Sequence, residues 1–255
     1  MTPRIFPTLL LVLAITLLMT LPACSITPEQ RTAGASHADL SAATLPAVAA
    51  EFVTHRSGQN IEDESNPLHE SHSPDEETII WRFWRDNRKI DIERPRLALG
   101  ESWVLDGRNL IHHKLYHADR KAIEFQQDDL TMLQQTPSWQ KLSLLFDPSL
   151  LQQLQAGEID WSAGYPKQAY QGTLNGMSWH IVMRLDQALP LLIERQQAGF
   201  SERTELHGSY PLKAAPWQPA ATDNYEIIDY ADLGDRESDP FVIKVQAQMG
   251  HQHAH

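Results

Sequence analysis

Residues 78–125 read TIIWRFWRDNRKIDIERPRLALGESWVLDGRNLIHHKLYHADRKAIEF and are the densest run of strand-forming residues in the chain. Ile79, Trp81 and Phe83 fall on one side of a two-residue period, with mixed side chains between them. Such a period is typical of a β-strand whose two faces meet different surroundings. Further along, an Asp-Gly pair at positions 106–107 is a common hairpin turn. The stretch therefore predicts an antiparallel meander of four or five strands.

Helices are predicted directly after this meander. Ser138 can cap a helix over residues 139–145, because a serine side chain accepts a hydrogen bond from a free backbone N–H of the first turn. Asp147-Pro148 supplies the cap and the first residue of a second helix. We interpret residues 186–199 as a third short helix.

A second hairpin is predicted where Asn175-Gly176 joins two strand-like runs. It is the strongest hairpin signal in the sequence, and one more strand is expected at residues 204–207. The meander, the helices and the hairpin together predict an α+β domain over residues 78–217. We expect a curled antiparallel sheet with two or three short helices packed on one of its faces.

The first residues have the pattern of an export signal. Arg4 precedes an apolar run over residues 5–21, and this run is short and ends in Leu21-Pro22-Ala23-Cys24. A basic residue, a short apolar run and small residues after it are typical of a secretion signal rather than a membrane span. Residues 1–23 are therefore predicted to be a signal peptide. Cys24 is the only cysteine in the chain, so no internal disulfide is expected.

The Leu-x-Ala-Cys pattern after an apolar run resembles the lipobox of bacterial lipoproteins, with Pro22 as a departure from the small or aliphatic residue usual there. The resemblance implies cleavage before Cys24, a diacylglyceryl thioether on its sulfur and an acyl chain such as palmitate on its amino group. Ser25 after the cysteine implies, by the same resemblance, the periplasmic side of the outer membrane of a Gram-negative bacterium. The alternative is an ordinary cleaved signal with an incidental cysteine.

The two ends of the mature chain have a different composition from the predicted domain. Residues 24–77 are rich in Ala, Ser, Thr, Pro, Glu and His, which predicts a flexible, disordered tether behind the lipid anchor. Residues 218–255 are predicted to be an acidic linker and a histidine-rich tail.

Net charge and the absence of recognised catalytic motifs argue against two classes of function. The formal charge of −12 argues against a nucleic-acid partner, because nucleic acids attract basic surfaces. The sequence has no Gly-x-Ser-x-Gly elbow, P-loop or dinucleotide fingerprint, so we do not expect an enzyme.

The order of the predicted elements is similar to that of the half-barrel lipoprotein carriers and receptors of the localisation-of-lipoproteins type. This resemblance implies a non-enzymatic envelope lipoprotein whose apolar cavity receives a lipid-like ligand. The apolar side chains expected to line that cavity are Trp81, Phe83, Trp103, Trp179 and Ile181. The alternative is that they form a packed core, and that the partner is another envelope protein.

A second hypothesis concerns metal. His251, His253 and His255 end the chain in a His-x-His-x-His pattern, and imidazole is a good ligand for Zn, Cu and Ni. A flexible tail can fold so that three nitrogens meet one ion. The chain would then be a metal-handling periplasmic lipoprotein; the alternative is a polar terminus that binds metal incidentally. No other cofactor is predicted.

Overall fold

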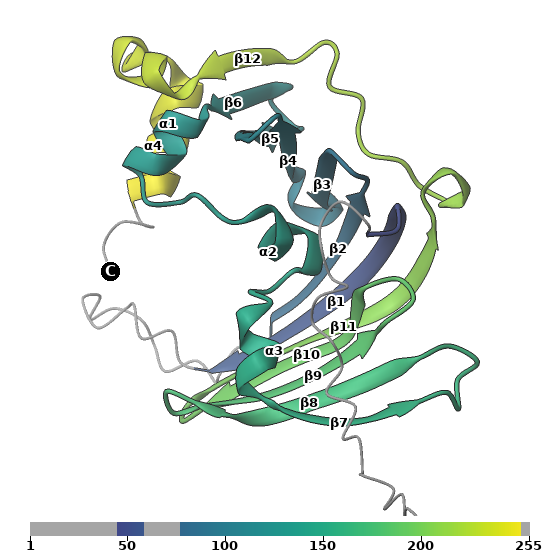
Figure 1. The fold of residues 1–255 in the computed structure, drawn as a ribbon. Coiled ribbons are helices and arrows are strands. Elements are labelled where there is room, and N and C mark those ends of the chain that lie inside the picture. The colour runs from purple at the N-terminus through teal and green to yellow at the C-terminus, as the bar shows by residue number, and fades with distance from the viewer. Residues whose placement is uncertain (1–44, 59–76, 251–255) are drawn as a thin grey trace, which may run out of the picture. The chain divides into compact units, whose positions relative to one another are not determined.

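The computed structural model describes residues 45–58 and 77–250. Its main feature is one sheet of 12 strands in the order β12-β6-β5-β4-β3-β2-β1-β11-β10-β9-β8-β7. All neighbours in this sheet are antiparallel except β12, which runs parallel to β6. Figure 1 shows that the sheet curls into an open arc, with α1, α2 and α3 on its concave side.

The strands are β1 (Val48–Gly58), β2 (Glu77–Arg85), β3 (Lys89–Arg94), β4 (Leu99–Asp106), β5 (Asn109–Tyr116), β6 (Lys121–Phe125), β7 (Gln155–Asp160), β8 (Lys167–Leu174), β9 (Met177–Arg184), β10 (Leu189–Gln197), β11 (Phe200–Pro211) and β12 (Glu226–Asp229). The helices are η3 (Pro95–Leu97), α1 (Gln127–Met132), α2 (Trp139–Leu144), α3 (Ser149–Gln153), η4 (Leu212–Ala214), η5 (Tyr230–Arg236) and α4 (Pro240–Gly250). No described helix is long and apolar enough to cross a membrane.

The curled, largely antiparallel sheet and its short helices agree with the prediction, but the α+β class does not. Strands dominate the described residues, and the helices are few and short. Both hairpins form as predicted: Asp106 ends β4 next to a left-handed Gly107, and Asn175 and Gly176, both left-handed, join β8 to β9. The Ser138 cap is also confirmed, since its Oγ accepts a hydrogen bond from the Lys141 N–H at 3.1 Å.

The structure corrects the predicted tether, because β1 lies within residues 24–77 and occupies the middle of the sheet. This strand pairs with β2 on one edge and with β11 on the other. Val48, Ala49 and Ala50 are almost completely buried, as is Phe52. The small side chains of this strand let neighbouring elements pack closely on it. A central strand therefore lies within a segment whose average composition is that of a linker.

The predicted C-terminal linker is also wrong, since residues 226–247 pack on the sheet. Phe241, Val242 and Val245 of α4 are buried in the larger core, together with Leu233 of η5 and Ile228 of β12. Of the acidic side chains that suggested a linker, Asp232, Asp235 and Glu237 are exposed, and Asp229 and Asp239 are partly buried. One of them, Asp239, caps α4 by accepting a hydrogen bond from the Phe241 N–H at 2.8 Å.

The predicted third helix, residues 186–199, is instead strand β10. Its apolar residues run consecutively from Leu189 to Ile193, and Pro190 sits at an irregularity in the pairing with β9. A β-bulge tolerates a proline because the regular ladder bond is already interrupted there. The apolar run therefore belongs to a buried strand.

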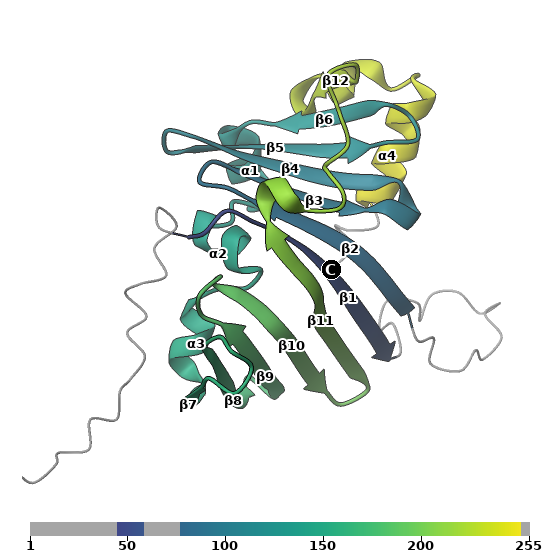
Figure 2. The same ribbon diagram turned by 90° about the vertical axis from the view of Figure 1, so that its right-hand side faces the viewer.

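Two cores fill the concave side. The larger lies between β1–β6 and the elements α1, η5 and α4, and the smaller lies between β8–β9 and the α2–α3 segment. On the convex side, residues 212–225 cross from the end of β11 to β12, as Figure 2 shows. We call residues 212–225 the strap.

Candidate functional site

Two pockets open on the concave side of the sheet, one on each side of α2. The Trp103 pocket, with a volume of about 880 Å³, lies between β4–β6, the α1–α2 connection and η5. The Trp81 pocket, with a volume of about 740 Å³, lies between β1–β3, β9–β11 and the α2–α3 segment. Lys141 of α2 lines both pockets, so the two adjoin at this residue.

The wall of the Trp81 pocket is mixed, with ten apolar and twelve polar or charged residues from the sheet and the α2–α3 segment. The apolar residues are Ile79, Trp81, Ile92, Leu145, Phe146, Leu150, Leu174, Met177, Trp179 and Ile193. The Trp81 ring stacks on Phe52 with centroids 4.6 Å apart, and its Nε1–H donates to Thr54 Oγ1 at 2.9 Å. The indole is thus fixed by packing and by a hydrogen bond while it still lines the pocket.

Three of the six charged residues that line the Trp81 pocket, Arg56, Arg195 and Glu202, form one cluster. Glu202 accepts hydrogen bonds from Arg56 Nε at 2.6 Å and from Arg195 Nε at 2.9 Å. Burial would raise the pKa of the Glu202 carboxyl, but the two guanidinium groups hold it below its ordinary value. This carboxylate is therefore charged at neutral pH and belongs to a satisfied cluster.

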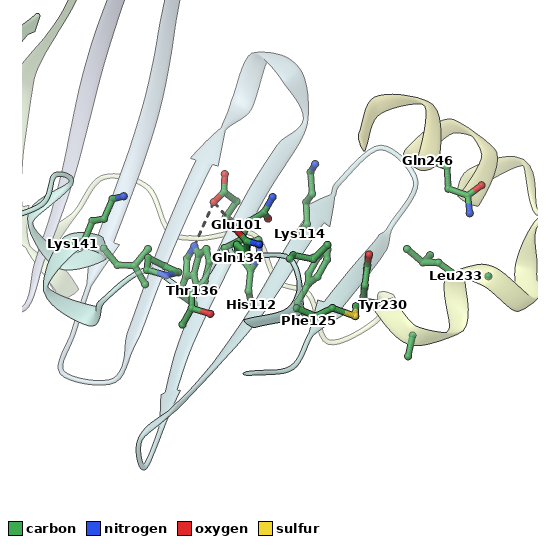
Figure 3. Close-up of a pocket in the computed structure, with 18 residues that line it drawn as sticks. Glu101, His112, Lys114, Phe125, Gln134, Thr136, Lys141, Tyr230, Leu233 and Gln246 are labelled. Carbon is green, nitrogen blue, oxygen red and sulfur yellow. Dashed lines mark hydrogen bonds and ion pairs between the residues drawn. The ribbon is translucent and has the colours of Figure 1, made fainter. Parts of the chain in front are cut away.

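The Trp103 pocket contains a column of four stacked rings. Trp103 stacks on His112 at 3.9 Å, His112 on Phe125 at 5.4 Å, and Phe125 on Tyr230 at 4.9 Å between ring centroids. Figure 3 shows His112, Phe125 and Tyr230 along the wall of the pocket. The first three rings come from neighbouring strands, and the fourth is brought to them by η5.

Glu101 is the acidic group of this pocket, and it is already paired. Its Oε1 accepts a hydrogen bond from Arg94 Nη1 at 2.9 Å, and its Oε2 lies 3.8 Å from His112 Nε2. Burial would raise the pKa of Glu101, but Arg94 and the other neighbours hold it below its ordinary value. Burial lowers the pKa of His112 to about 4, so this imidazole is neutral at neutral pH.

The residues predicted to line a ligand cavity fall into two groups. Trp81 and Trp179 line the Trp81 pocket, and Trp103 lines the Trp103 pocket. Phe83 and Ile181 are both 0% exposed and lie inside the two cores. Because Phe83 and Ile181 line neither pocket, they are not candidates for ligand contact.

Sequence reasoning missed His112, Lys114 and Tyr230 as residues of the Trp103 pocket. His112 could have been found, because the Asp106-Gly107 turn fixes the register that places it opposite Trp103. The sequence around Tyr230 does not indicate that this residue lies in the pocket. Tyr230 reaches the pocket on η5, in a segment that the sequence predicts to be a linker.

Cys24, His251, His253 and His255 lie outside the described residues. Within residues 45–58 and 77–250, no group of three or more His, Cys, Asp or Glu side chains is arranged to hold a metal ion.

Comparisons with known proteins give a distant set of structural neighbours. No protein-family model and no curated protein matches the sequence. PNGF-II in a C2 crystal form has a TM-score of 0.36 at 10% identity, and the match covers 72% of this chain and 31% of that one. PNGF-II in a P21 crystal form has a TM-score of 0.36 at 12% identity, and the match covers 74% of this chain and 33% of that one. This chain thus spans about a third of the PNGF-II chains. An uncharacterized conserved protein from Thermus thermophilus has a TM-score of 0.34 at 11% identity, and the match covers 71% of this chain and 90% of that one.

Proposed function

We propose that this protein binds an apolar, lipid-like ligand in the Trp81 pocket and does no chemistry on it. We further propose that it does so as an envelope lipoprotein, held through acylated Cys24 at the periplasmic side of the outer membrane. The observation that carries the ligand proposal is the Trp81 pocket itself, a space of about 740 Å³ between the curled sheet and the α2–α3 segment.

The size of this pocket and the apolar part of its lining suit an aliphatic chain. Pockets of roughly 300–1,000 Å³ are typical of sites that bury most of a small ligand, and apolar and aromatic side chains are their usual lining. Each methylene group removed from water contributes about 0.8 kcal/mol. Trp81 and Trp179 both line the pocket and offer large apolar surfaces to such a chain.

The first test is ligand binding by a variant of the pocket wall. We expect W179A to weaken oleyl alcohol binding by about tenfold or more, because an indole supplies about 2 kcal/mol of apolar contact. Titration of the soluble chain with oleyl alcohol, followed by tryptophan fluorescence and native mass spectrometry, measures the affinity. W161A is the matched control, since Trp161 is 65% exposed and lines neither pocket. Equal affinity in W179A and W161A would show that the pocket is not the binding site.

The second test concerns the anchor. We expect C24S to move the protein from the membrane fraction to the soluble periplasmic fraction, because serine lacks the thiol that receives the diacylglyceryl group. Labelling with radioactive palmitate should mark the wild-type protein and leave C24S unlabelled. A labelled C24S protein, or a wild-type protein that stays soluble, would contradict lipidation at Cys24.

A further inference from the structure

Two lysines of the Trp103 pocket lack an acidic partner at bonding distance. Among the described residues, neither Lys114 Nζ nor Lys141 Nζ forms an ion pair or a hydrogen bond. Other lysines of the sheet differ in this respect: Lys121 contacts Glu226 at 3.2 Å, and Lys167 contacts Asp160 at 3.2 Å. Within residues 45–58 and 77–250, the pocket thus holds two cations that form no ion pair.

The pocket's own carboxylate does not balance these charges. Glu101 is held by Arg94 at 2.9 Å, so that pair is neutral as a unit, and His112 carries no charge at neutral pH. The charge of Lys141 helps to lower the pKa of Asp147, but the two side chains form no ion pair. Asp147 does not line this pocket. Lys114 and Lys141 therefore make the Trp103 pocket locally positive on a chain whose formal charge is −12.

Lys114 is also partly removed from water. It is half-buried on β5, and its burial lowers the pKa of the ammonium group. The charge of Glu101 opposes this shift, but among the described residues no carboxylate forms an ion pair with Lys114, so a bound anion would stabilise the ammonium group further. In the view of Figure 3, Lys114 and Lys141 lie on either side of Glu101, whose carboxylate forms an ion pair with Arg94 at 2.9 Å.

We propose that the ligand is an amphipathic anion, a long aliphatic chain with a single anionic group, and that the positive charge of Lys114 and Lys141 draws the anionic group to the Trp103 pocket. This inference rests on the proposed function, because the chain of the ligand lies in the Trp81 pocket, which adjoins the Trp103 pocket at Lys141.

The experiment compares ligands that differ only at the head group. Oleate and oleyl alcohol are titrated below their aggregation limits into the wild-type protein, the double variant K114Q/K141Q and the control K213Q. Lys213 lies exposed in η4 and lines neither pocket. We expect the wild type and K213Q to bind oleate about tenfold more tightly than the alcohol, since a hydrogen bond to a charged group contributes about 1.5–3 kcal/mol. In K114Q/K141Q the two ligands should bind within about twofold of each other.

The outcomes separate this inference from the proposed function. Equal binding of oleate and oleyl alcohol to the wild type, with both weakened by W179A, overturns the anionic head group and leaves the apolar ligand standing. A preference for oleate that persists in K114Q/K141Q overturns the assignment to these lysines. Failure of the wild type to bind either ligand overturns both proposals. Lysophosphatidic acid with the same chain, titrated alongside, identifies by its relative affinity whether the lysines favour phosphate or carboxylate.

Discussion

The side chain of Arg85 forms hydrogen bonds to three separate segments of the chain. Its guanidinium is buried, with the residue 1% exposed, and it donates to the carbonyl oxygens of Pro46, Ser143, Gln187 and Ala188 at 2.6–3.3 Å. These carbonyls belong to the segment before β1, to α2 and to the β9–β10 turn. Burial lowers the pKa of Arg85 to about 10, which leaves it charged at neutral pH.

We expect R85M to destabilise the protein by about 3–5 kcal/mol, because it leaves buried carbonyl groups without donors. Urea unfolding followed by tryptophan fluorescence measures the change. The matched control is R88M, since the Arg88 side chain is 70% exposed and its loss should change stability by less than about 0.5 kcal/mol. Equal destabilisation by the two variants would show that the buried hydrogen bonds contribute little.

His112 should make stability depend on pH. Its pKa falls from 6.5 to about 4 on folding, so the unfolded chain binds the proton more readily. The stabilisation is fully present above pH 6.5 and is lost as pH falls toward 4, by up to about 3 kcal/mol. H112F keeps a ring in the column and cannot be protonated, so its stability should fall less over this range. Parallel pH profiles of the two proteins, measured by urea unfolding, would contradict a buried neutral imidazole.

At the scale of elements, α4 is expected to be part of the folded core. Deleting residues 240–255 removes Phe241, Val242 and Val245, which are at most 5% exposed. At about 1.5–3 kcal/mol for each buried side chain, the loss approaches the whole stability of an ordinary domain. We therefore expect this deletion to abolish cooperative thermal unfolding. Deleting only residues 251–255 removes none of these contacts and is the control; a normal melting transition in both would show that α4 is dispensable.

The elements that the sequence analysis predicted correctly depend on residues that are close together in the chain. The two hairpins and the Ser138 cap depend on residues within a few positions of each other, and turn chemistry alone predicts them. Strand β1 and helix α4 depend on distant partners: β1 is buried because β2 and β11 lie on either side, and α4 because it covers Tyr116. Of the pocket residues, Trp81, Trp103 and Trp179 were expected, whereas the place of Lys114 in the pocket depends on which groups the fold brings near it, which a sequence does not display.

For the described sheet as a whole, the strap ties two distant parts together across the convex face. Trp217 packs edge-on against Trp84 of β2 at 5.3 Å and against Tyr210 of β11 at 5.7 Å. Further along, the Ala220 N–H donates to Glu93 Oε1 at 2.6 Å, and Tyr225 Oη lies 2.9 Å from His117 Nδ1. The strap thus spans the middle of the sheet and delivers η5, with Tyr230, to the Trp103 pocket.

The central position of β1 has a consequence for how the protein folds. Thr54 of β1 and Thr204 of β11 meet through their hydroxyl oxygens at 2.8 Å, yet they are 150 residues apart in the chain. Domains whose contacts join distant residues fold slowly, because a long loop must close before the contact is gained. Until β11 has been synthesised, the strand emerging first has an open edge, and such edges invite pairing between molecules. Synthesis therefore delivers the middle of the sheet early and completes its pairing late.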